Sequence, residues 1–232
     1  VATGKPYSKY KDSCVEWLGQ APEGWEVRRL KFVIKGKLLY GANSSGTEYN
    51  SNLPRYIRIT DFTQNGKLNS EKKLSLPINI AKGYYVKEGD ILFARSGATV
   101  GKAFQCKKLD EVSCFAGYLI KAEPDNRIIT SDYLYSFTQS LVFLKWKNYS
   151  FIKATIENIG ADKYSQLIVS LPPLEEQHQI VSYIETKTAA LALAISRTER
   201  EIALMQEYRT RLVSDVVTGK IDVRYIKISD IA

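Results

Sequence analysis

The chain has 232 residues, 44% of them hydrophobic, which is enough to bury at least one core and is typical of one or two domains. Its formal net charge is +8 and its single histidine is His178, so we expect neither a histidine-based metal site nor a Ser-His-Asp triad. No apolar run approaches the roughly 18–20 residues that span a bilayer, and we expect no signal peptide. The three cysteines lack metal-ligand spacing, which indicates reduced thiols. We therefore expect a cytoplasmic protein with no membrane attachment, metal or cofactor.

The first predicted elements are short strands. The segment Tyr56–Thr60 alternates, which places its two isoleucines on one face and its arginine and threonine on the other. Further along, the turn residues 87–90 separate predicted strands at 84–86 and 91–93, and 115–121 is another candidate strand. These elements predict a sheet-rich part with many loops.

A glycine-rich stretch, GDILFARSGATVGKAF at 89–104, looks at first like a phosphate-binding loop ending in Gly101 and Lys102. Such a loop needs G-x-x-x-x-G-K-[ST], but Ser96 stands where the first glycine is required and Ala103 offers no hydroxyl to a metal. We therefore do not expect nucleotide binding. We expect Gly97 and Gly101 instead to make a tight connection between two strands.

One helix interrupts the strands. The sequence Thr130-Ser131-Asp132 is a good N-terminal cap, and the apolar positions that follow are spaced to line one face: Tyr133, Phe137, Leu141 and Leu144. The next segment, 145–151, interleaves basic and aromatic residues as a DNA-facing loop does. The alternative is a solvated basic turn with Trp146 and Phe151 in the core.

From Pro172 to Gly219 the pattern predicts a single long helix. Prolines and two glutamates suit its first turn, and no further Gly or Pro occurs until Gly219, which suits a C-terminal cap. The interval allows a helix of about 43 residues, roughly 65 Å long at 1.5 Å per residue. We accordingly divide the chain into a globular domain at 1–171, a long helix at 172–218 and a tail at 219–232.

Positions along this helix that recur alternately four and three residues apart, from Ile184 to Val216, have the spacing of a coiled-coil seam, and apolar residues fill all of them except Thr188, Thr198 and Arg209. A lone helix with such a seam needs a partner, so we expect dimer or coiled-coil contacts through its large apolar members, Ile184, Leu191, Ile195, Ile202, Met205 and Leu212.

The positive charge is confined to the first part of the chain. Residues 1–173 hold 25 Lys and Arg against 16 Asp and Glu, a net charge of +9, whereas residues 174–232 hold 8 against 9, a net charge of −1. The first part also contains 23 of the 26 aromatic residues. A basic, aromatic-rich globule favours a polyanionic partner, with nucleic acid the leading candidate.

Several short motifs, taken together in their order and spacing, resemble the specificity subunit of type I restriction–modification enzymes over nearly the whole chain. The opening segment, the internal signatures and the bounds of the long helix carry this resemblance: WLG at 17–19, PEGWEV at 22–27, YIRITD at 56–61, GDIL at 89–92 with SGATVGK at 96–102, LPPLEEQ at 171–177 and VTGKID at 217–222. Cys14 departs from the glycine common at its position.

The resemblance implies an α+β fold, a globular mixed-sheet target recognition domain followed by a long helix in an antiparallel coiled coil. It also implies a non-catalytic protein that recognises one half of a bipartite duplex DNA target. Such a subunit positions a methyltransferase (modification) subunit and, in some systems, a restriction or translocase subunit. The family usually carries two recognition domains and two long helices, so this chain corresponds to half of that arrangement, either a half-length subunit that forms a homodimer or a fragment of a longer chain.

Candidate DNA contacts are basic and polar residues near the predicted turns and the basic–aromatic segment. They are Arg55, Arg58, Lys82, Arg95, Ser96, Thr99, Lys102, Lys145, Lys147, Asn148, Tyr149 and Lys153.

Two alternative functions remain open from the sequence. A coiled-coil scaffold could use its basic globule to bind an acidic protein. A nuclease could use Asp61 with Glu71-Lys72-Lys73, an acid followed by E-x-K, although this pattern is common in lysine-rich loops. An adenine methyltransferase is disfavoured, because Leu171-Pro172-Pro173-Leu174 lacks the polar and aromatic residues that flank the prolines of its motif.

Overall fold

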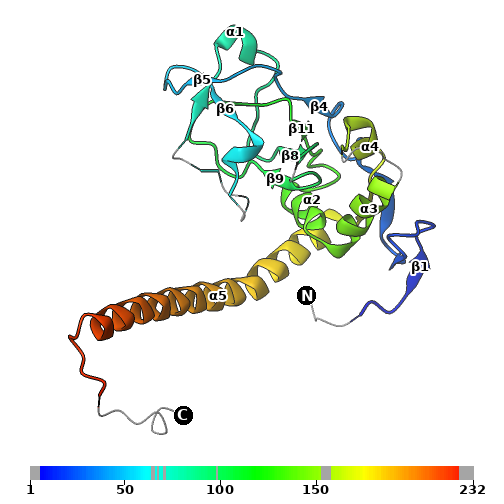
Figure 1. Cartoon of the computed structure of the whole chain (residues 1–232). Coiled ribbons are helices and arrows are strands. Elements are labelled where there is room, and N and C mark those ends of the chain that lie inside the picture. The colour runs from blue at the N-terminus through cyan, green and yellow to red at the C-terminus, as the bar shows by residue number, and fades with distance from the viewer. Residues whose placement is uncertain are drawn as a thin grey trace. The chain divides into compact units, whose positions relative to one another are not determined.

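The computed structural model describes residues 6–63, 66, 68–69, 72–97, 99–152 and 158–224. The chain divides into two compact units, Val1–Val181 and Ser182–Ala232. The first is a mixed unit of short strands and helices, and the second contains most of one long helix (Figure 1). The predicted mixed fold, with sheets followed by a long helix, is confirmed.

Two four-stranded sheets form the centre of the first unit. One is antiparallel throughout and has the order β4-β11-β8-β9, comprising Leu39–Tyr40, Leu119–Ala122, Ile91–Ala94 and Ala103–Gln105. The other has the order β10-β6-β7-β5, with a parallel β10–β6 pair, comprising Ser113–Phe115, Arg55–Ile57, Leu74–Ser75 and Thr47–Glu48.

The two sheets share a hydrophobic core. Ile57 and Phe115 from one sheet pack in the same cluster as Leu92 and Leu119 from the other, and all four side chains are fully buried. Every residue of β8 and β11 is buried, which is expected of central strands covered on both faces.

Two pairs of strands lie outside these sheets. β1 (Tyr10–Asp12) pairs with β2 (Gln20–Pro22), and β3 (Glu26–Arg29) pairs with β12 (Ile168–Leu171), both antiparallel. The β3–β12 pair therefore joins the beginning of the unit to the segment that immediately precedes the long helix.

The structure corrects the predicted strand at Tyr56–Thr60. Strand β6 ends at Ile57 and a 3-10 turn, η2 (Ile59–Asp61), follows, because the Asp61 carboxylate accepts a hydrogen bond from the Arg58 backbone N–H at 2.8 Å. All three residues of β6 are buried, so alternation between a core face and a solvent face does not apply to this central strand.

The predicted strand at 115–121 is two strands. A turn interrupts it, in which the Leu119 N–H donates to the Ala116 carbonyl at 2.9 Å, so β10 ends at Phe115 and β11 starts at Leu119. The turn predicted at 87–90 is present, with the Lys87 N–H donating to the Asp90 carboxylate at 2.8 Å before β8 begins. Residues 84–86 do not form a strand, and Tyr85 makes only an isolated bridge to Cys114.

The predicted helix after Thr130 is two helices, α2 (Ser131–Thr138) and α3 (Leu141–Ile152). The Thr130 hydroxyl caps the first, accepting from the Tyr133 N–H at 3.2 Å. The Ser140 hydroxyl accepts from the Phe143 N–H at 3.2 Å, so a serine starts the second helix where the prediction continued the first. Two short helices complete the unit, α1 (Ile78–Ala81) and α4 (Ala161–Ser165).

This break changes the face expected on the helix. Tyr133 and Phe137 are buried as predicted, but Leu141 is 75% exposed and Leu144 is 43% exposed. Because both leucines belong to the second helix, they do not continue the apolar face of the first.

The long helix α5 (Leu174–Val217) has 44 residues, and its predicted bounds are nearly correct. At its start, the fully buried Gln177 accepts from the Thr130 N–H at 2.8 Å and donates to the carbonyls of Ile128 and Pro172, both at 2.9 Å. At its end, Gly219 has φ +73° and donates to the Val216 carbonyl at 3.1 Å. Among the residues that the structure describes, no helix is long and apolar enough to cross a membrane.

Candidate nucleic-acid interface

A groove of about 910 Å³ opens on the surface of the first unit, and we call it the Arg95 groove. Four segments line it: the loop after β4, the start of η2, the residues directly after β8, and the turn before β11. Asn158 completes it. The segments meet closely, since a Cβ added at Gly41 would lie 2.2 Å from the Ala116 carbonyl oxygen. Only glycine permits this approach of two backbones.

Arg95 is held in this groove from two sides. Its guanidinium carbon lies 4.9 Å from the centre of the Tyr40 ring, and its Nη1 donates to the Gly117 carbonyl at 3.5 Å. The Tyr40 hydroxyl in turn accepts from the Ala161 N–H at 2.9 Å, which fixes the ring under the arginine. The arginine is thus a partly exposed cation with a defined orientation, which suits recognition of a polar ligand.

Arg58 also lines the groove, and it is paired. Its Nη2 donates to the Asp61 carboxylate at 2.8 Å, and Asp61 is only 4% exposed. Both carboxylate oxygens of Asp61 accept bonds from Arg58, which orients the guanidinium and leaves its side chain 35% exposed. The same pairing speaks against a nuclease metal ligand at Asp61, and the Glu71 of that motif lies outside the described residues.

Ser96 and Thr99 lie in the connection between β8 and β9. The Gly101 N–H donates to the Ala94 carbonyl at 3.0 Å and the Ala94 N–H donates to the Lys102 carbonyl at 2.8 Å, which makes the connection a tight hairpin. Gly97 and Gly101 have φ of +77° and +79°, so the two glycines serve this turn and not a phosphate loop.

The hairpin lies against α3. A Cβ added at Gly101 would lie 2.2 Å from Cδ of Lys147, so the aliphatic part of Lys147 packs on the hairpin. Lys102 is exposed, and both lysines line a smaller depression of about 260 Å³. The structure therefore brings these two predicted contacts together, although they are 45 positions apart in the sequence.

The basic–aromatic segment at 145–151 is a helix and not a loop. Lys145, Asn148 and Tyr149 are exposed on α3, whereas Trp146 is buried between the rings of Phe143, at 5.3 Å, and Tyr164, at 5.5 Å. The core position of Trp146 agrees with the alternative interpretation. The side chain of Phe151, and Lys153 as a whole, lie outside the described residues.

Two more expected contacts lie away from the groove. Lys82 is exposed at the C-terminal end of α1. Arg55 is only 7% exposed, and its guanidinium lies 3.6 Å from the Glu111 carboxylate and donates to the Asn69 carbonyl. The burial and the ion pair of Arg55 argue against the expected DNA contact and indicate a role in the fold.

Glu111 contacts several polar and charged groups near Arg55. Its carboxylate accepts from Lys73 at 2.6 Å and from the Tyr49 hydroxyl at 2.7 Å. Burial alone would raise the pKa of Glu111, but these hydrogen bonds and the nearby positive charges outweigh burial and hold the pKa below its usual value.

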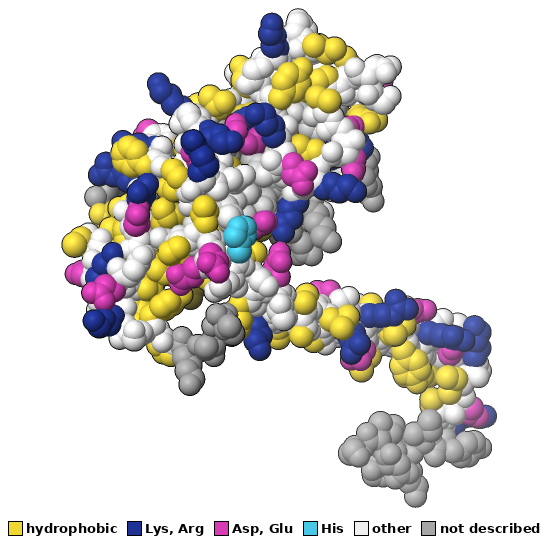
Figure 2. Space-filling view, turned by 180° about the vertical axis from the view of Figure 1, so that it is seen from behind, with side chains coloured by type: hydrophobic (Ala, Val, Ile, Leu, Met, Phe, Trp, Pro, Cys, Tyr) yellow, Lys and Arg dark blue, Asp and Glu magenta, His cyan; other side chains and the backbone are white. Residues whose placement is uncertain are grey.

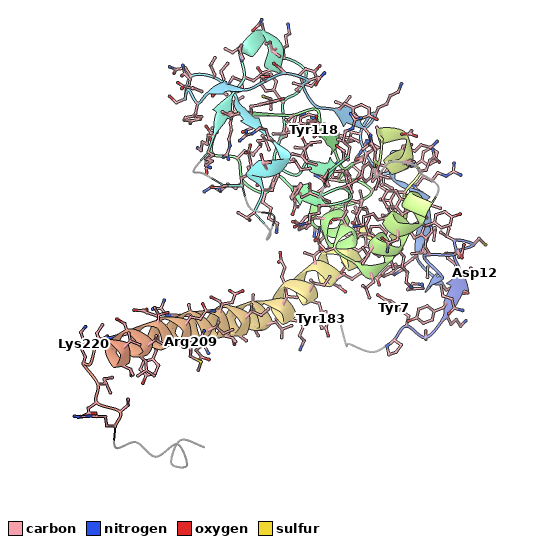
Figure 3. The ribbon with its side chains drawn as sticks, viewed as in Figure 1. Tyr7, Asp12, Tyr118, Tyr183, Arg209 and Lys220 are labelled. Atoms are coloured by element: carbon pink, nitrogen blue, oxygen red, sulfur yellow. The ribbon has the colours of Figure 1, made fainter. Side chains whose placement is uncertain are left out.

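Of the residues that line the groove, the sequence predicted only Arg58, Arg95 and Ser96, and those missed include Tyr40, Tyr118 and Asn158. Tyr118 is 66% exposed in the turn before β11 and is labelled in Figure 3. The available signal for it was the preceding Gly117, because an isolated glycine inside a strand pattern indicates a bulge or a close approach of backbones. Asn158 carried no such signal, because only the isolated bridge between Asn158 and Ser96 brings it to the groove.

The charge of the first unit is distributed widely. Figure 2 shows Lys and Arg side chains interspersed with acidic and apolar ones on the face turned to the viewer. Within the described residues, no three His, Cys, Asp or Glu side chains are grouped in a way that could hold a metal ion. The unit therefore offers two arginines in the Arg95 groove and separate lysines outside it, which suits a combination of base-reading and backbone-positioning contacts to DNA.

Comparison with known proteins finds relatives that are specificity subunits of type I restriction enzymes. The family model for the type I restriction modification DNA specificity domain matches residues 22–202. The chain is 25% identical over 220 residues to the type I restriction enzyme EcoKI specificity subunit of Escherichia coli K12, covering 89% of this chain and 45% of that protein. It is 31% identical over 172 residues to the MjaVIII specificity subunit of Methanocaldococcus jannaschii, covering 71% of this chain and 36% of that protein.

Solved structures show the same fold. The HsdS subunit from Thermoanaerobacter tengcongensis matches with a TM-score of 0.60 at 17% identity, covering 93% of this chain and 53% of that one. A chain from a study of complex assembly and conformational transition of the type I R-M system matches with a TM-score of 0.61 at 23% identity, covering 86% of this chain and 47% of that one. The chain thus covers between 36% and 53% of the length of these four proteins.

Proposed function

The chain belongs to the type I restriction modification DNA specificity domain family, and from this premise we propose that it recognises one half of a bipartite duplex DNA target. It does so with its globular unit and without catalysis of its own. Its role is to place a methyltransferase subunit and, in systems that contain one, a restriction or translocase subunit on that target.

The observation that carries the proposal is the Arg95 groove on a strongly basic unit. Residues 1–173 hold a net charge of +9, which attracts the phosphate backbone whatever the base sequence. Arg95 and Arg58 are oriented by Tyr40 and Asp61, and oriented guanidinium groups read base edges better than mobile ones. Exposed Lys102, on the hairpin that follows Arg95, is suited to a phosphate contact.

The partner of the long helix is the second part of the proposal. The seam residues Leu191, Ile195 and Ile202 are 62%, 58% and 50% exposed, which is unfavourable for large apolar side chains in water. We assign this seam to a second copy of the chain, running antiparallel, so that the dimer recognises an inverted repeat of one half-site.

A dimer would leave another part of the helix uncovered. Leu193 and Leu204 are 55% and 53% exposed, and at about 100° per residue they lie roughly opposite the seam. Arg200 lies between them on the same side of the helix. We assign this mixed apolar and basic face to the methyltransferase subunit.

The test is selection from a pool of duplexes in which two half-sites and the gap between them are randomised. The expected result is enrichment of a bipartite inverted repeat, with an affinity that falls steeply as salt rises. Binding to acidic proteins but not to duplexes would support the scaffold alternative instead. Cleavage of the enriched duplex in the presence of magnesium, without any added subunit, would contradict the non-catalytic role.

A further inference from the structure

Two buried polar atoms lack a hydrogen-bond partner in the Arg95 groove. They are Nε of Arg95, a donor, and Oδ1 of Asn158, an acceptor. Among the described residues, only two other buried side-chain atoms are unpaired, and both belong to a separate cavity lined by Arg55 and Gln105. Buried polar atoms are nearly always paired, so a donor and an acceptor left unpaired in one groove call for an explanation.

The backbone holds the two residues next to each other. Ser96 forms an isolated antiparallel bridge with Asn158, and the Ile159 N–H donates to the Arg95 carbonyl at 2.9 Å. This bridge fixes the amide of Asn158 beside the segment that carries the guanidinium. Both side chains line the groove, so a ligand bound there can supply the missing partners once the buried atoms turn toward it.

The chemistry of the two unpaired atoms restricts the ligand. Oδ1 of Asn158 needs a donor, which a phosphate does not have at neutral pH. Nε of Arg95 needs an acceptor. The other end of the guanidinium is already engaged, because Nη1 donates to the Gly117 carbonyl. A single ligand that pairs with both atoms must therefore present both a donor and an acceptor, and a phosphate group alone does not.

In the major groove, adenine is the one base whose own edge has this pattern. In the major groove adenine presents an amino donor at N6 and an acceptor at N7, whereas guanine presents two acceptors, cytosine a donor and thymine an acceptor. Asparagine is also the side chain that pairs most naturally with adenine. Exposed Tyr118 and the ring of Tyr40 border the same groove and limit the space around a planar edge.

We propose, on the basis of the proposed DNA-recognition function, that Asn158 and Arg95 form a base-reading pair that selects an adenine in the half-site. Asn158 accepts from the adenine N6 amino group, and the Arg95 guanidinium donates to N7. Tyr40 is a positioning residue, which holds the guanidinium at the level of the base edge through the contact of its ring.

The experiment uses the full chain and the duplex enriched by selection. Each adenine of the half-site is replaced in turn by 7-deazaadenine, which lacks the N7 acceptor. At one adenine the replacement should weaken binding by the unaltered protein roughly 10- to 100-fold, the range expected for a bidentate base contact. Asn158→Ala should bind the natural duplex more weakly, accept other bases at that position when the selection is repeated, and keep the salt dependence of the unaltered protein.

Controls separate this inference from the proposed function. Asn52→Ala removes an amide from a turn outside the groove and should select the same sequence as the unaltered protein. If Asn158→Ala melts at a lower temperature, Asn158→Asp retains the Oδ1 acceptor and size but loses the donor, and it should still prefer adenine. A half-site without adenine, or an unchanged preference in Asn158→Ala, overturns the inference while the DNA-recognition function stands. Failure of the unaltered chain to bind any duplex overturns the function itself.

Discussion

The double substitution Leu191→Asp and Ile202→Asp should convert a dimer of this chain into monomers. Both residues belong to the seam of α5, whose six large apolar side chains are between 39% and 70% exposed. A charged aspartate is stable on the exposed face of a free helix, but burying it against a second helix costs free energy because the charge loses its water.

The size of the effect follows from the exposed fractions. Complete burial of a large apolar side chain is worth roughly 1.5–3 kcal/mol. About half of each seam side chain is available for burial, so the twelve side chains of two copies contribute on the order of 9–18 kcal/mol. Association costs an estimated ~4–15 kcal/mol, which is of the same order, so the dimer is sensitive to the loss of a few of these burials. Removing four of the twelve burials takes away about 3–6 kcal/mol, so the dissociation constant should rise at least about 100-fold.

Sedimentation velocity over a range of concentrations measures this change. The matched control is Ser196→Asp with Ser214→Asp, which adds the same charge to α5 at exposed positions off the seam and should leave the dimer intact. The seam variant should also lose its preference for a bipartite duplex and keep weak binding to a single half-site. An unaltered protein that sediments as a monomer at high micromolar concentration would refute the proposed pairing.

Three further predictions concern the globular unit. Lys102→Ala should weaken binding to all duplexes alike and reduce the salt dependence of binding by about one phosphate contact. The melting temperature should stay unchanged because the Lys102 side chain is exposed. A large loss of stability would show instead that Lys102 supports the fold. Gln177→Leu should lower the free energy of unfolding by roughly 2–4 kcal/mol in a denaturant titration, since it leaves the Thr130 N–H and two carbonyls without their partner. The pKa of the Glu111 carboxylate is lowered in the folded protein. Its contribution to the free energy of unfolding is therefore present above the unfolded pKa and is lost as pH falls through the folded pKa. The variant Glu111→Gln should be less stable than the unaltered protein at neutral pH, and its stability should change less with pH on the acid side.

Local patterns were sufficient to predict the long helix. Its bounds depend on prolines in the first turn, on Gly219 at the end, and on the lack of any glycine or proline between them. These are local effects on the backbone, so they act without help from the rest of the fold. The hairpin with Gly97 and Gly101 was predictable for the same reason, because positive φ is a property of the glycines themselves.

Packing decided the elements that the sequence alone did not predict. Alternation at Tyr56–Thr60 suggested a half-buried strand, but β6 is covered on both faces and ends where Asp61 bonds the backbone of Arg58. The apolar spacing after Thr130 suggested one helix, but Ser140 starts a second one. In both cases the burial of the segment differs from what its periodicity predicted, and a side-chain hydrogen bond marks the boundary between the two elements.

The sequence by itself determined the basic character of the globular part, the glycine hairpin and the long apolar-seamed helix, because composition and local backbone preferences are readable along the chain. Only the tertiary structure decided which arginine is buried in the fold and which lies in a surface groove. Arg55 and Arg95 both appear in the sequence as arginines beside strands, yet the first is buried and paired with Glu111, whereas the second lies in a groove against the ring of Tyr40. Asn158 joins Arg95 there because a backbone bridge crosses 62 positions of sequence, and contacts over such distances depend on how the whole chain packs.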